Sequence, residues 1–227
     1  MKRYYFDFRV INNRCSWLWA YSLLILLLLG CDSTKSDPTT ESKSLDLNNK
    51  IIFIQKQIPI RLLTNNNIPL KKLIDSLNIY SSGLHIEVDK SKYRLSICSG
   101  VSVIKEYPVV FGGNPLDEKL RQGDHCTPEG NFKVLMKYKH RAWSRFIWID
   151  YPNSESIAKI NKAKRAGIIP ADANPGGEIG IHGVPGNNNY MIDYRENWTL
   201  GCISLKNKDI NEIYEVVNKD TRVIIRK

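Results

Sequence analysis

Apolar and polar residues alternate from Gly83 onward, and this period of two limits the possible folds of the 227-residue chain more than any other pattern in it. Residues 84–88 alternate in this way, and so do residues 93–97. Successive side chains of a β-strand point to opposite faces, so each stretch predicts a strand with one buried face. A turn at Ser99-Gly100 leads into a third expected strand over residues 101–111. The pattern therefore predicts a β-meander.

Fewer helices than strands are expected further along the chain. We expect strands at residues 131–139, 145–150, 178–181 and 221–226. Residues 154–167 predict a helix capped by Ser154 and ended by Gly167, and Asp209 is expected to cap a second helix near the C-terminus. The predicted fold class is therefore mostly β with few helices (α+β).

The first thirty residues are typical of a secretory signal peptide. Residues 1–16 contain four basic residues, Lys2, Arg3, Arg9 and Arg14, and one acidic residue, Asp7. An apolar run follows over residues 17–29. A helix of 13 residues spans about 20 Å, which is shorter than a hydrocarbon core of roughly 30 Å. We therefore expect residues 1–30 to be cleaved rather than to span a membrane.

Cys31 gives this segment a more specific interpretation. Leu28-Leu29-Gly30-Cys31, followed at once by polar residues, resembles the signal of bacterial lipoproteins, in which the cysteine is acylated. Residues 31–50 are then a lipidated cysteine and a flexible tether, because they contain almost nothing apolar. The resemblance places the protein in the cell envelope, facing the periplasm or cell wall. It leaves open which membrane holds the anchor.

The mature chain divides into an extension and a domain. Ile68, Leu70, Leu73, Ile74 and Leu77 recur at near-helical spacing, so residues 51–82 predict an N-terminal extension with one helix, before a domain over residues 83–227. Without residues 1–30 the chain keeps 29 Lys and Arg against 22 Asp and Glu, a net charge of +7. These charges are scattered, so we expect no nucleic-acid partner.

Cys202 and His182 are the residues best suited to chemistry. Cys202 follows Gly201, which lets the backbone turn tightly, and His182 ends an expected strand. A thiol needs a neighbouring base to become a nucleophile, and histidine is the usual partner. A buried core pair is the alternative. Cys98 and Cys126 are expected to be structural, and a disulfide between them is left open.

Five segments in sequence order resemble the catalytic domain of the L,D-transpeptidases, the YkuD-type cell-wall enzymes. They are Tyr107-Pro108-Val109-Val110-Phe111-Gly112, Gly123-Asp124-His125-Cys126-Thr127-Pro128-Glu129-Gly130, Tyr151-Pro152-Asn153, Gly176-Gly177-Glu178-Ile179-Gly180-Ile181-His182-Gly183 and Thr199-Leu200-Gly201-Cys202-Ile203. The resemblance implies a mixed β-sandwich with a helix near the C-terminus and a cysteine nucleophile in a cleft.

The resemblance also implies roles for individual residues. Cys202 would be the nucleophile and His182 the general base, with the Gly183 carbonyl orienting the imidazole. The Gly201 and Cys202 N–H groups would form the oxyanion hole. The substrate would contact residues around the nucleophile, namely Trp198, Thr199 and Ser204.

Two positions depart from the family pattern. Leu200 stands where many members have histidine, and Ser204 stands where they have an arginine that would clamp a carboxylate. The resemblance still implies a cysteine acyltransferase acting on peptidoglycan stem peptides through a Cys202 thioester, which an amine or water resolves. The choice between transpeptidation and hydrolysis stays open, as do the acyl donor and acceptor.

The alternative function is a catalytically silent lipoprotein that binds peptidoglycan. We expect a monomer without a cofactor. We also expect no metal, because the spacing of His125, Cys126, His182 and Cys202 matches no structural zinc pattern.

Overall fold

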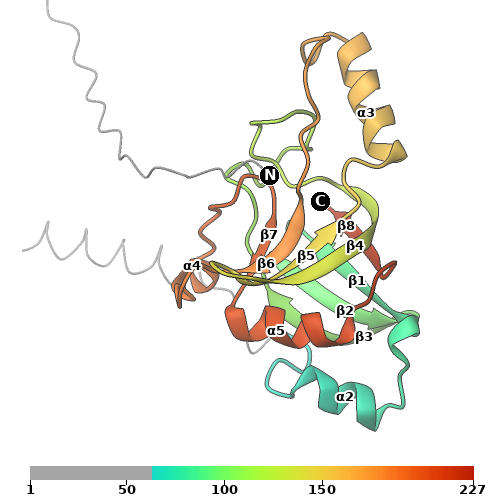
Figure 1. Ribbon diagram of the computed structural model, residues 1–227, viewed down its shortest axis with the longest axis vertical. Helices are drawn as coiled ribbons and strands as arrows, with labels where there is room; N and C mark the ends of the chain where they lie inside the picture. The colour runs from blue at the N-terminus through green and yellow to red at the C-terminus, as the bar shows by residue number, and fades with distance from the viewer. Residues whose placement is uncertain (1–62) are drawn as a thin grey trace, which may run out of the picture. The chain divides into compact units, whose positions relative to one another are not determined.

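One long strand, β4, joins the two halves of the sheet in the computed structural model, which describes residues 63–227. The strands of this described part are β1 Leu84–Asp89, β2 Arg94–Ser99, β3 Ser102–Pro108, β4 Gly130–His140, β5 Ser144–Ile149, β6 Gly180–Gly183, β7 Ile203–Leu205 and β8 Arg222–Arg226. They form one eight-stranded sheet in the order β3-β2-β1-β8-β4-β5-β6-β7 (Figure 1).

The sheet is mixed. Strands β1, β2 and β3 pair antiparallel in sequence order, which confirms the predicted meander. The C-terminal strand β8 inserts beside β1 in parallel, and β6 pairs with β7 in parallel, whereas β4 is antiparallel to both β5 and β8. The mostly β class and the mixed sheet are as predicted.

Strand β4 turns the sheet from one layer to the next. Residues 130–133 pair with β8, whereas residues 134–140 pair with β5 after a shift in register. The chain that leaves edge strand β3 then reaches the opposite edge, where Val110 bridges Ser204 and Gly112 bridges Thr199. The two edges of the sheet are therefore connected through residues 110–112, and this connection places Gly112 beside the turn that precedes Cys202.

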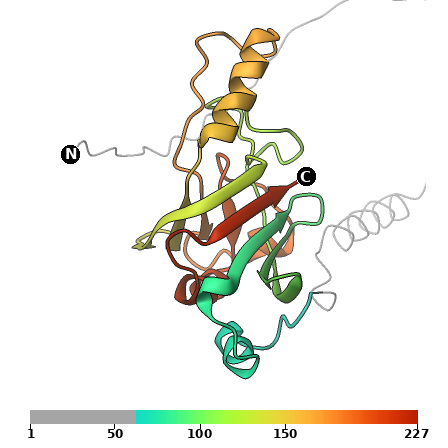
Figure 2. The same ribbon diagram turned by 90° about the vertical axis from the view of Figure 1, so that its right-hand side faces the viewer.

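The helices of the described part are α2 Leu70–Ser76, the short 3-10 helix η2 Ser81–Gly83, α3 Ser154–Arg165, α4 Tyr190–Asp193 and α5 Asn207–Val216. Helix α5 covers β5 and β6 with its buried residues, which include Ile210 and Ile213, and α2 packs beside α5. Helix α3 stands away from the sheet, at the end opposite to α2 (Figures 1 and 2). Among the described residues, no helix is both long enough and apolar enough to cross a membrane.

Both predicted helix caps were wrong. Asn153 caps α3, because its side-chain oxygen accepts a hydrogen bond from the Ser156 N–H at 3.0 Å, so Ser154 is the first helical residue. Helix α5 begins at Asn207, two residues before Asp209. Asp209 is buried in the first turn instead, where desolvation raises the pKa of its carboxyl to about 6.

Other elements differ from the sequence prediction in position. Strand β6 begins at Gly180 rather than 178, and both β7 and α4 were not predicted. Helix α2 lies within the stretch whose spacing predicted a helix. The expected signal peptide (1–30), the lipidated Cys31 with its tether (31–50) and the first part of the extension lie outside the described residues.

Candidate active site

His182 lies on the short strand β6, between β5 and the edge strand β7. Its register partners are Phe146 on β5 and Ser204 on β7. The imidazole Nδ1 lies 2.8 Å from the Gly183 carbonyl oxygen. Because a carbonyl only accepts hydrogen bonds, Nδ1 carries the proton and Nε2 keeps the basic lone pair. This is the contact that the family resemblance implied for Gly183.

Aromatic rings enclose the His182 imidazole. Trp143 stacks on it with ring centroids 4.4 Å apart, Phe146 lies nearly parallel at 5.6 Å, and Trp198 meets it edge-on at 5.5 Å. Only 1% of His182 is exposed. This desolvation lowers the pKa of the imidazole to about 4, against the opposing effect of the Gly183 hydrogen bond. His182 is therefore neutral at pH 7.

Cys202 immediately precedes β7, the strand parallel to β6. Its Sγ donates to the Glu178 carbonyl at 3.5 Å. Desolvation raises the pKa of the thiol to about 11, although a hydrogen bond from the Gly180 N–H and the charge of Lys119 act in the opposite direction. The resting thiol is therefore protonated, so the site holds a neutral thiol and a neutral imidazole rather than an ion pair.

The turn before Cys202 depends on Gly201 and Thr199. Gly201 has φ +137°, and a Cβ there would lie 2.7 Å from the Cys126 carbonyl oxygen. The Thr199 hydroxyl donates to the Cys202 carbonyl at 2.7 Å and accepts from the Gly201 N–H at 3.2 Å. The Gly201 N–H is thus already bonded within the turn, so the prediction that it serves an oxyanion hole has no support in this geometry. Thr199 is buried and shapes the turn.

Ser204 lies behind the imidazole rather than in the cleft. It is fully buried, and its hydroxyl donates to the Gly183 carbonyl at 3.5 Å, the same oxygen that accepts from His182. That Ser204 contacts substrate stays a prediction, and the complete burial of its side chain gives it no support. The third expected contact, Trp198, is partly exposed beside His182. Its indole nitrogen is buried and has no hydrogen-bond partner among the described residues.

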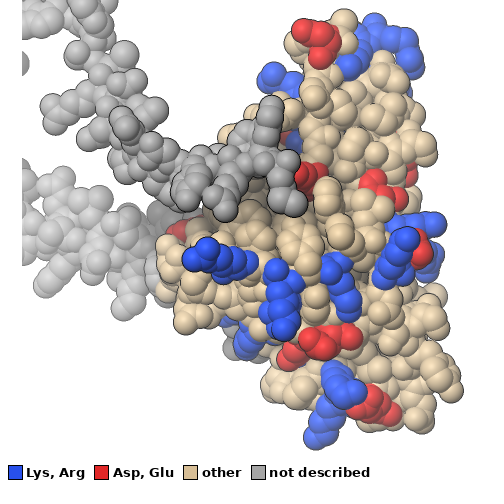
Figure 3. All heavy atoms as spheres, viewed as in Figure 1, with Lys and Arg blue, Asp and Glu red and all other residues tan. Residues whose placement is uncertain are grey.

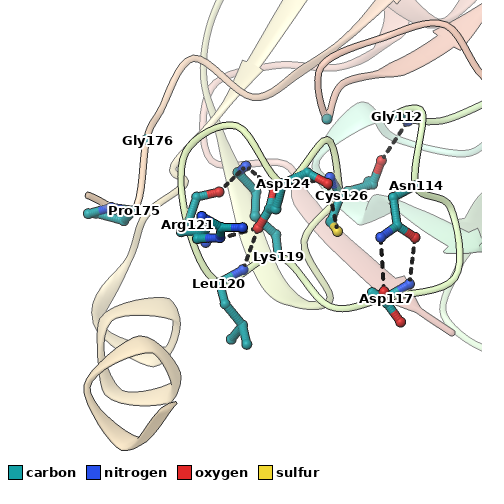
Figure 4. Close-up of polar contacts among 12 residues, drawn as sticks. Gly112, Asn114, Asp117, Lys119, Leu120, Arg121, Asp124, Cys126, Pro175 and Gly176 are labelled. Carbon is teal, nitrogen blue, oxygen red and sulfur yellow. Dashed lines mark hydrogen bonds and ion pairs between the residues drawn. The ribbon is translucent and has the colours of Figure 1, made fainter. Parts of the chain in front are cut away.

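A loop over residues 112–126 reaches the turn before Cys202 through the bridge between Gly112 and Thr199. Figure 4 shows the hydrogen bonds within this loop. The Asp124 carboxylate accepts hydrogen bonds from the Leu120 and Arg121 N–H groups at 2.8 and 2.9 Å and from the Lys119 ammonium at 2.9 Å. Lys119 is 4% exposed, and its charge acts on Cys202. The loop therefore fixes a buried Lys119–Asp124 ion pair whose cation acts on Cys202. Sequence reasoning missed this residue.

Tyr138 is a second residue that sequence reasoning missed. It is the β4 register partner of Phe146, and the two rings stack with centroids 5.4 Å apart. Burial raises the pKa of its phenol, and the charges of Glu178 and Cys202 add to this shift. Tyr138, Phe146, His182 and Ser204 thus form one row across four strands. The alternation in residues 131–139 and 145–150 contains the signal, but the row requires the register.

The other two described cysteines are buried away from solvent. Cys98 and Cys126 are buried free thiols, and no disulfide joins them. Desolvation, together with nearby carboxylates, raises the pKa of each to about 11. Both thiols are therefore protonated at neutral pH. His125 is exposed in the loop over residues 112–126.

Comparison with known families agrees with this site. A family model described as "L,D-transpeptidase catalytic domain" (YkuD) matches residues 83–225, more than half of the chain. The match covers β1 to β8 and includes both His182 and Cys202. The chain therefore belongs to the YkuD family of L,D-transpeptidase catalytic domains. No curated protein sequence matched the chain.

Solved structures with a similar fold have low sequence identity to this chain. Bd1075 of Bdellovibrio bacteriovorus is 21% identical, with a TM-score of 0.45 over 63% of this chain and 48% of that one. The helical cell shape determining protein Pgp2 of Campylobacter jejuni is 18% identical, with a TM-score of 0.48 over 70% and 55%. An L,D-transpeptidase of Xylanimonas cellulosilytica is 17% identical, with a TM-score of 0.42 over 63% and 60%. The alignments span about half the length of the first two structures.

Proposed function

We propose that this protein is a cell-envelope cysteine acyltransferase of the L,D-transpeptidase type, acting on peptidoglycan stem peptides. One observation carries the proposal: within a YkuD domain, His182 lies on β6 and Cys202 immediately precedes β7, the parallel neighbour of β6, and the Gly183 carbonyl fixes the imidazole with its basic Nε2 unprotonated. A thiol beside a fixed neutral base is the arrangement that nucleophilic acyl transfer needs.

Because the His182 imidazole and the Cys202 thiol are both neutral at rest, we propose that His182 activates the thiol as a general base. As Cys202 Sγ attacks a peptide carbonyl, His182 Nε2 takes the thiol proton and then gives it to the leaving amine, so a C–S bond forms and a C–N bond breaks. A second amine, or water, then attacks the thioester while His182 takes its proton. The C–S bond breaks, and the proton returns to Cys202. Every proton and electron pair is accounted for without a further reactant.

The surrounding groups supply charge stabilisation and substrate contacts. Two backbone N–H groups, those of Gly201 and Cys202, were expected to bind the oxyanion. Because the Gly201 N–H donates to the Thr199 hydroxyl, the Cys202 N–H is the donor that remains for the oxyanion. Trp198 is partly exposed beside His182, which supports its predicted contact with the substrate. Lys119 adds positive potential to the same site. These donors suit a substrate rich in carbonyl and carboxylate oxygens.

The place of action forms part of the proposal and depends on sequence alone. Acylation of Cys31 after removal of residues 1–30 would anchor the mature chain to a membrane. The tether over residues 31–50 would let the domain reach peptidoglycan. On the face shown in Figure 3, Lys and Arg are interspersed with Asp and Glu rather than gathered in one block.

Incubation of the purified protein with muropeptides, followed by mass analysis of the products, tests the proposal. We expect new cross-links, exchanged terminal residues or shortened stems with the wild type, and none with Cys202→Ala. Cys98→Ala is the matched control, because it removes another described cysteine, on β2, and leaves β6 and β7 untouched. Products that persist in Cys202→Ala would overturn the assignment.

A catalytically silent peptidoglycan-binding lipoprotein is the second candidate, and the raised pKa of the Cys202 thiol favours it. Such a protein would retain isolated peptidoglycan in a pull-down experiment. It would give the same binding with Cys202→Ala and no covalent adduct in the wild type. The two candidates therefore differ in covalent chemistry.

A further inference from the structure

A second cluster of metal-ligating side chains lies on strands β1 and β2, outside the candidate active site. His85 and Glu87 are two residues apart on β1, so both side chains point to the same face. Cys98 on β2 is the register partner of His85. The nitrogen, oxygen and sulfur ligand atoms of the three residues all lie within 4.8 Å of one another. The pairing of two strands alone therefore brings three different ligand types together.

Burial and local backbone geometry distinguish this cluster from an ordinary polar surface. His85 is 5% exposed and Cys98 is 4% exposed. The pairing of β2 with β3 shifts in register between Ile97 and Cys98. Such irregularities occur where a strand must redirect a side chain. A buried histidine directly opposite a buried cysteine needs an explanation beyond apolar packing.

The carboxylate of the cluster is already oriented. Glu87 Oε2 accepts a hydrogen bond from Arg226 Nη1 at 2.9 Å, and its Oε1 lies 3.4 Å from His85 Nε2. A second-shell hydrogen bond to a ligating carboxylate is a common feature of metal sites, because it fixes the oxygen that faces the ion. The negative charge of Glu106 also acts on Cys98, against the positive charge of Arg226.

We propose that His85, Glu87 and Cys98 bind a divalent zinc ion. Zinc takes nitrogen, oxygen and thiolate ligands at about 2.0 to 2.3 Å, so in a tetrahedral site two ligand atoms lie roughly 3.3 to 3.8 Å apart. The separation of 3.4 Å between His85 Nε2 and Glu87 Oε1 lies in this range, and all three ligand atoms lie within 4.8 Å of one another. Coordination of Cys98 releases its thiol proton to the solvent, and the tetrahedral geometry leaves a fourth position for water.

A surface pocket adjoins the cluster at Glu87, and neither His85 nor Cys98 lines it. It has a volume of about 210 Å³ and is lined by Glu87, Arg94, Ser96, Glu106 and Arg226, among others. The strand order places β8, β4 and β5 between β1 and β6, so the zinc site and the His182–Cys202 site lie on different parts of the sheet. The proposal departs from the sequence prediction, which assigned no metal and gave Cys98 a structural role. It does not depend on the proposed enzymatic activity.

Cobalt titration of the reduced full-length protein tests the site. Co²⁺ bound to a thiolate gives a near-ultraviolet charge-transfer absorption, and excess Zn²⁺ should abolish it by displacement. We expect this band in the wild type, in Cys126→Ser and in Cys202→Ser, and its loss in Cys98→Ser. Absence of the band in the wild type would overturn the proposal, as would its survival in Cys98→Ser. Loss in Cys202→Ser alone would assign the metal to the active-site thiol and would also overturn it.

A second measurement covers the case in which Cys98→Ser folds poorly. Glu87 is the most exposed of the three ligands, so Glu87→Gln should keep the fold, which circular dichroism checks. Zn²⁺ should raise the thermal unfolding midpoint of the wild type and of Cys126→Ser, because a ligand that binds only the native state stabilises it. Glu87→Gln should show a smaller rise or none. An equal rise in wild type and Glu87→Gln would contradict the proposed ligand set.

Discussion

Phe146 and His182 are register partners on strands β5 and β6, and their rings lie within 7° of parallel. The same row continues to Tyr138 on one side and Ser204 on the other. The sheet therefore does more than hold the base in place. It surrounds the imidazole with aromatic surface on one side and anchors the Gly183 carbonyl on the other. The neutral state of His182 follows from this packing.

Removal of the Phe146 ring should raise the pKa of His182 from about 4 toward the ordinary 6.5, because water then reaches the imidazole. The acid limb of the pH profile of kcat/KM should move upward with it. Phe132→Ala is the control, because Phe132 is as deeply buried as Phe146 and does not contact His182. Both variants should lose about 3–5 kcal/mol of stability. An unchanged acid limb in Phe146→Ala would contradict this account of the low pKa.

Stability should depend on pH through the same residue. In the unfolded chain His182 binds a proton near pH 6.5, whereas in the folded protein it does so only near pH 4. Its contribution to stability is therefore full above about pH 6.5 and is lost as the pH falls toward 4, by about 3 kcal/mol. Urea unfolding of the wild type and His182→Gln at both pH values measures this. The difference between the two pH values should be smaller in His182→Gln.

Alkylation of Cys202 should follow a raised thiol pKa. Desolvation raises the pKa of this thiol to about 11, although a hydrogen bond from the Gly180 N–H and the charge of Lys119 act in the opposite direction. The rate of reaction with iodoacetamide, followed on the peptide that contains Cys202, should rise with pH throughout the neutral range. A rate that is independent of pH there would indicate a thiolate–imidazolium pair instead.

Thr199→Val should slow acylation of Cys202 by about tenfold or more. It removes the hydroxyl that bonds both the Gly201 N–H and the Cys202 carbonyl, so the turn that presents the nucleophile loosens. The stability cost should be about 1–3 kcal/mol. Thr221→Val removes another buried hydroxyl, one that accepts from the Asn218 N–H outside the site. Equal loss of acylation in both variants would mean that Thr199 acts only through stability.

A buried ion pair should hold the described part of the extension to the domain. Lys105 Nζ lies 2.7 Å from Glu212 Oε2 and donates to the Ile68 carbonyl, and Glu212 also accepts from the Leu70 N–H. Glu212→Ala should cost about 3 kcal/mol, because it leaves the Lys105 charge buried without its partner. Asp75→Ala, which breaks the exposed pair with Lys71, should cost about 0.5 kcal/mol or less. Chemical denaturation measures both values.

The sequence predicted local features better than long-range ones. Alternation located β1 and β2, the turn at Ser99-Gly100 located β3, which is buried along most of its length, and the segment order identified the family. The three-residue strand β7 was missed because it is too short to show a period and forms only by pairing with β6. The cap of α3 lies one residue earlier than predicted because the Asn153 side-chain oxygen accepts from the Ser156 N–H in the first turn.

The chemistry of the site also depended on contacts that no pattern encodes. Position relative to the family motif predicted the roles of Cys202, His182 and Gly183. Ser204 was placed in the cleft by the same reasoning, yet its pairing opposite His182 buries it completely. The hydrogen bond from the Gly201 N–H to Thr199 depends on the conformation of the turn, and the row that contains Tyr138 depends on the strand register. Neither can be read from the local sequence.

The most direct test of acyl transfer through a Cys202 thioester is mass spectrometry of the protein mixed with a muropeptide and quenched during turnover. We expect an acyl adduct, mapped to the peptide that contains Cys202, in the wild type and in Cys98→Ala, and none in Cys202→Ala. His182→Gln should form the adduct much more slowly, because the general base is absent. An adduct mapped to another residue, or turnover with no adduct and undiminished rate in Cys202→Ala, would contradict the account.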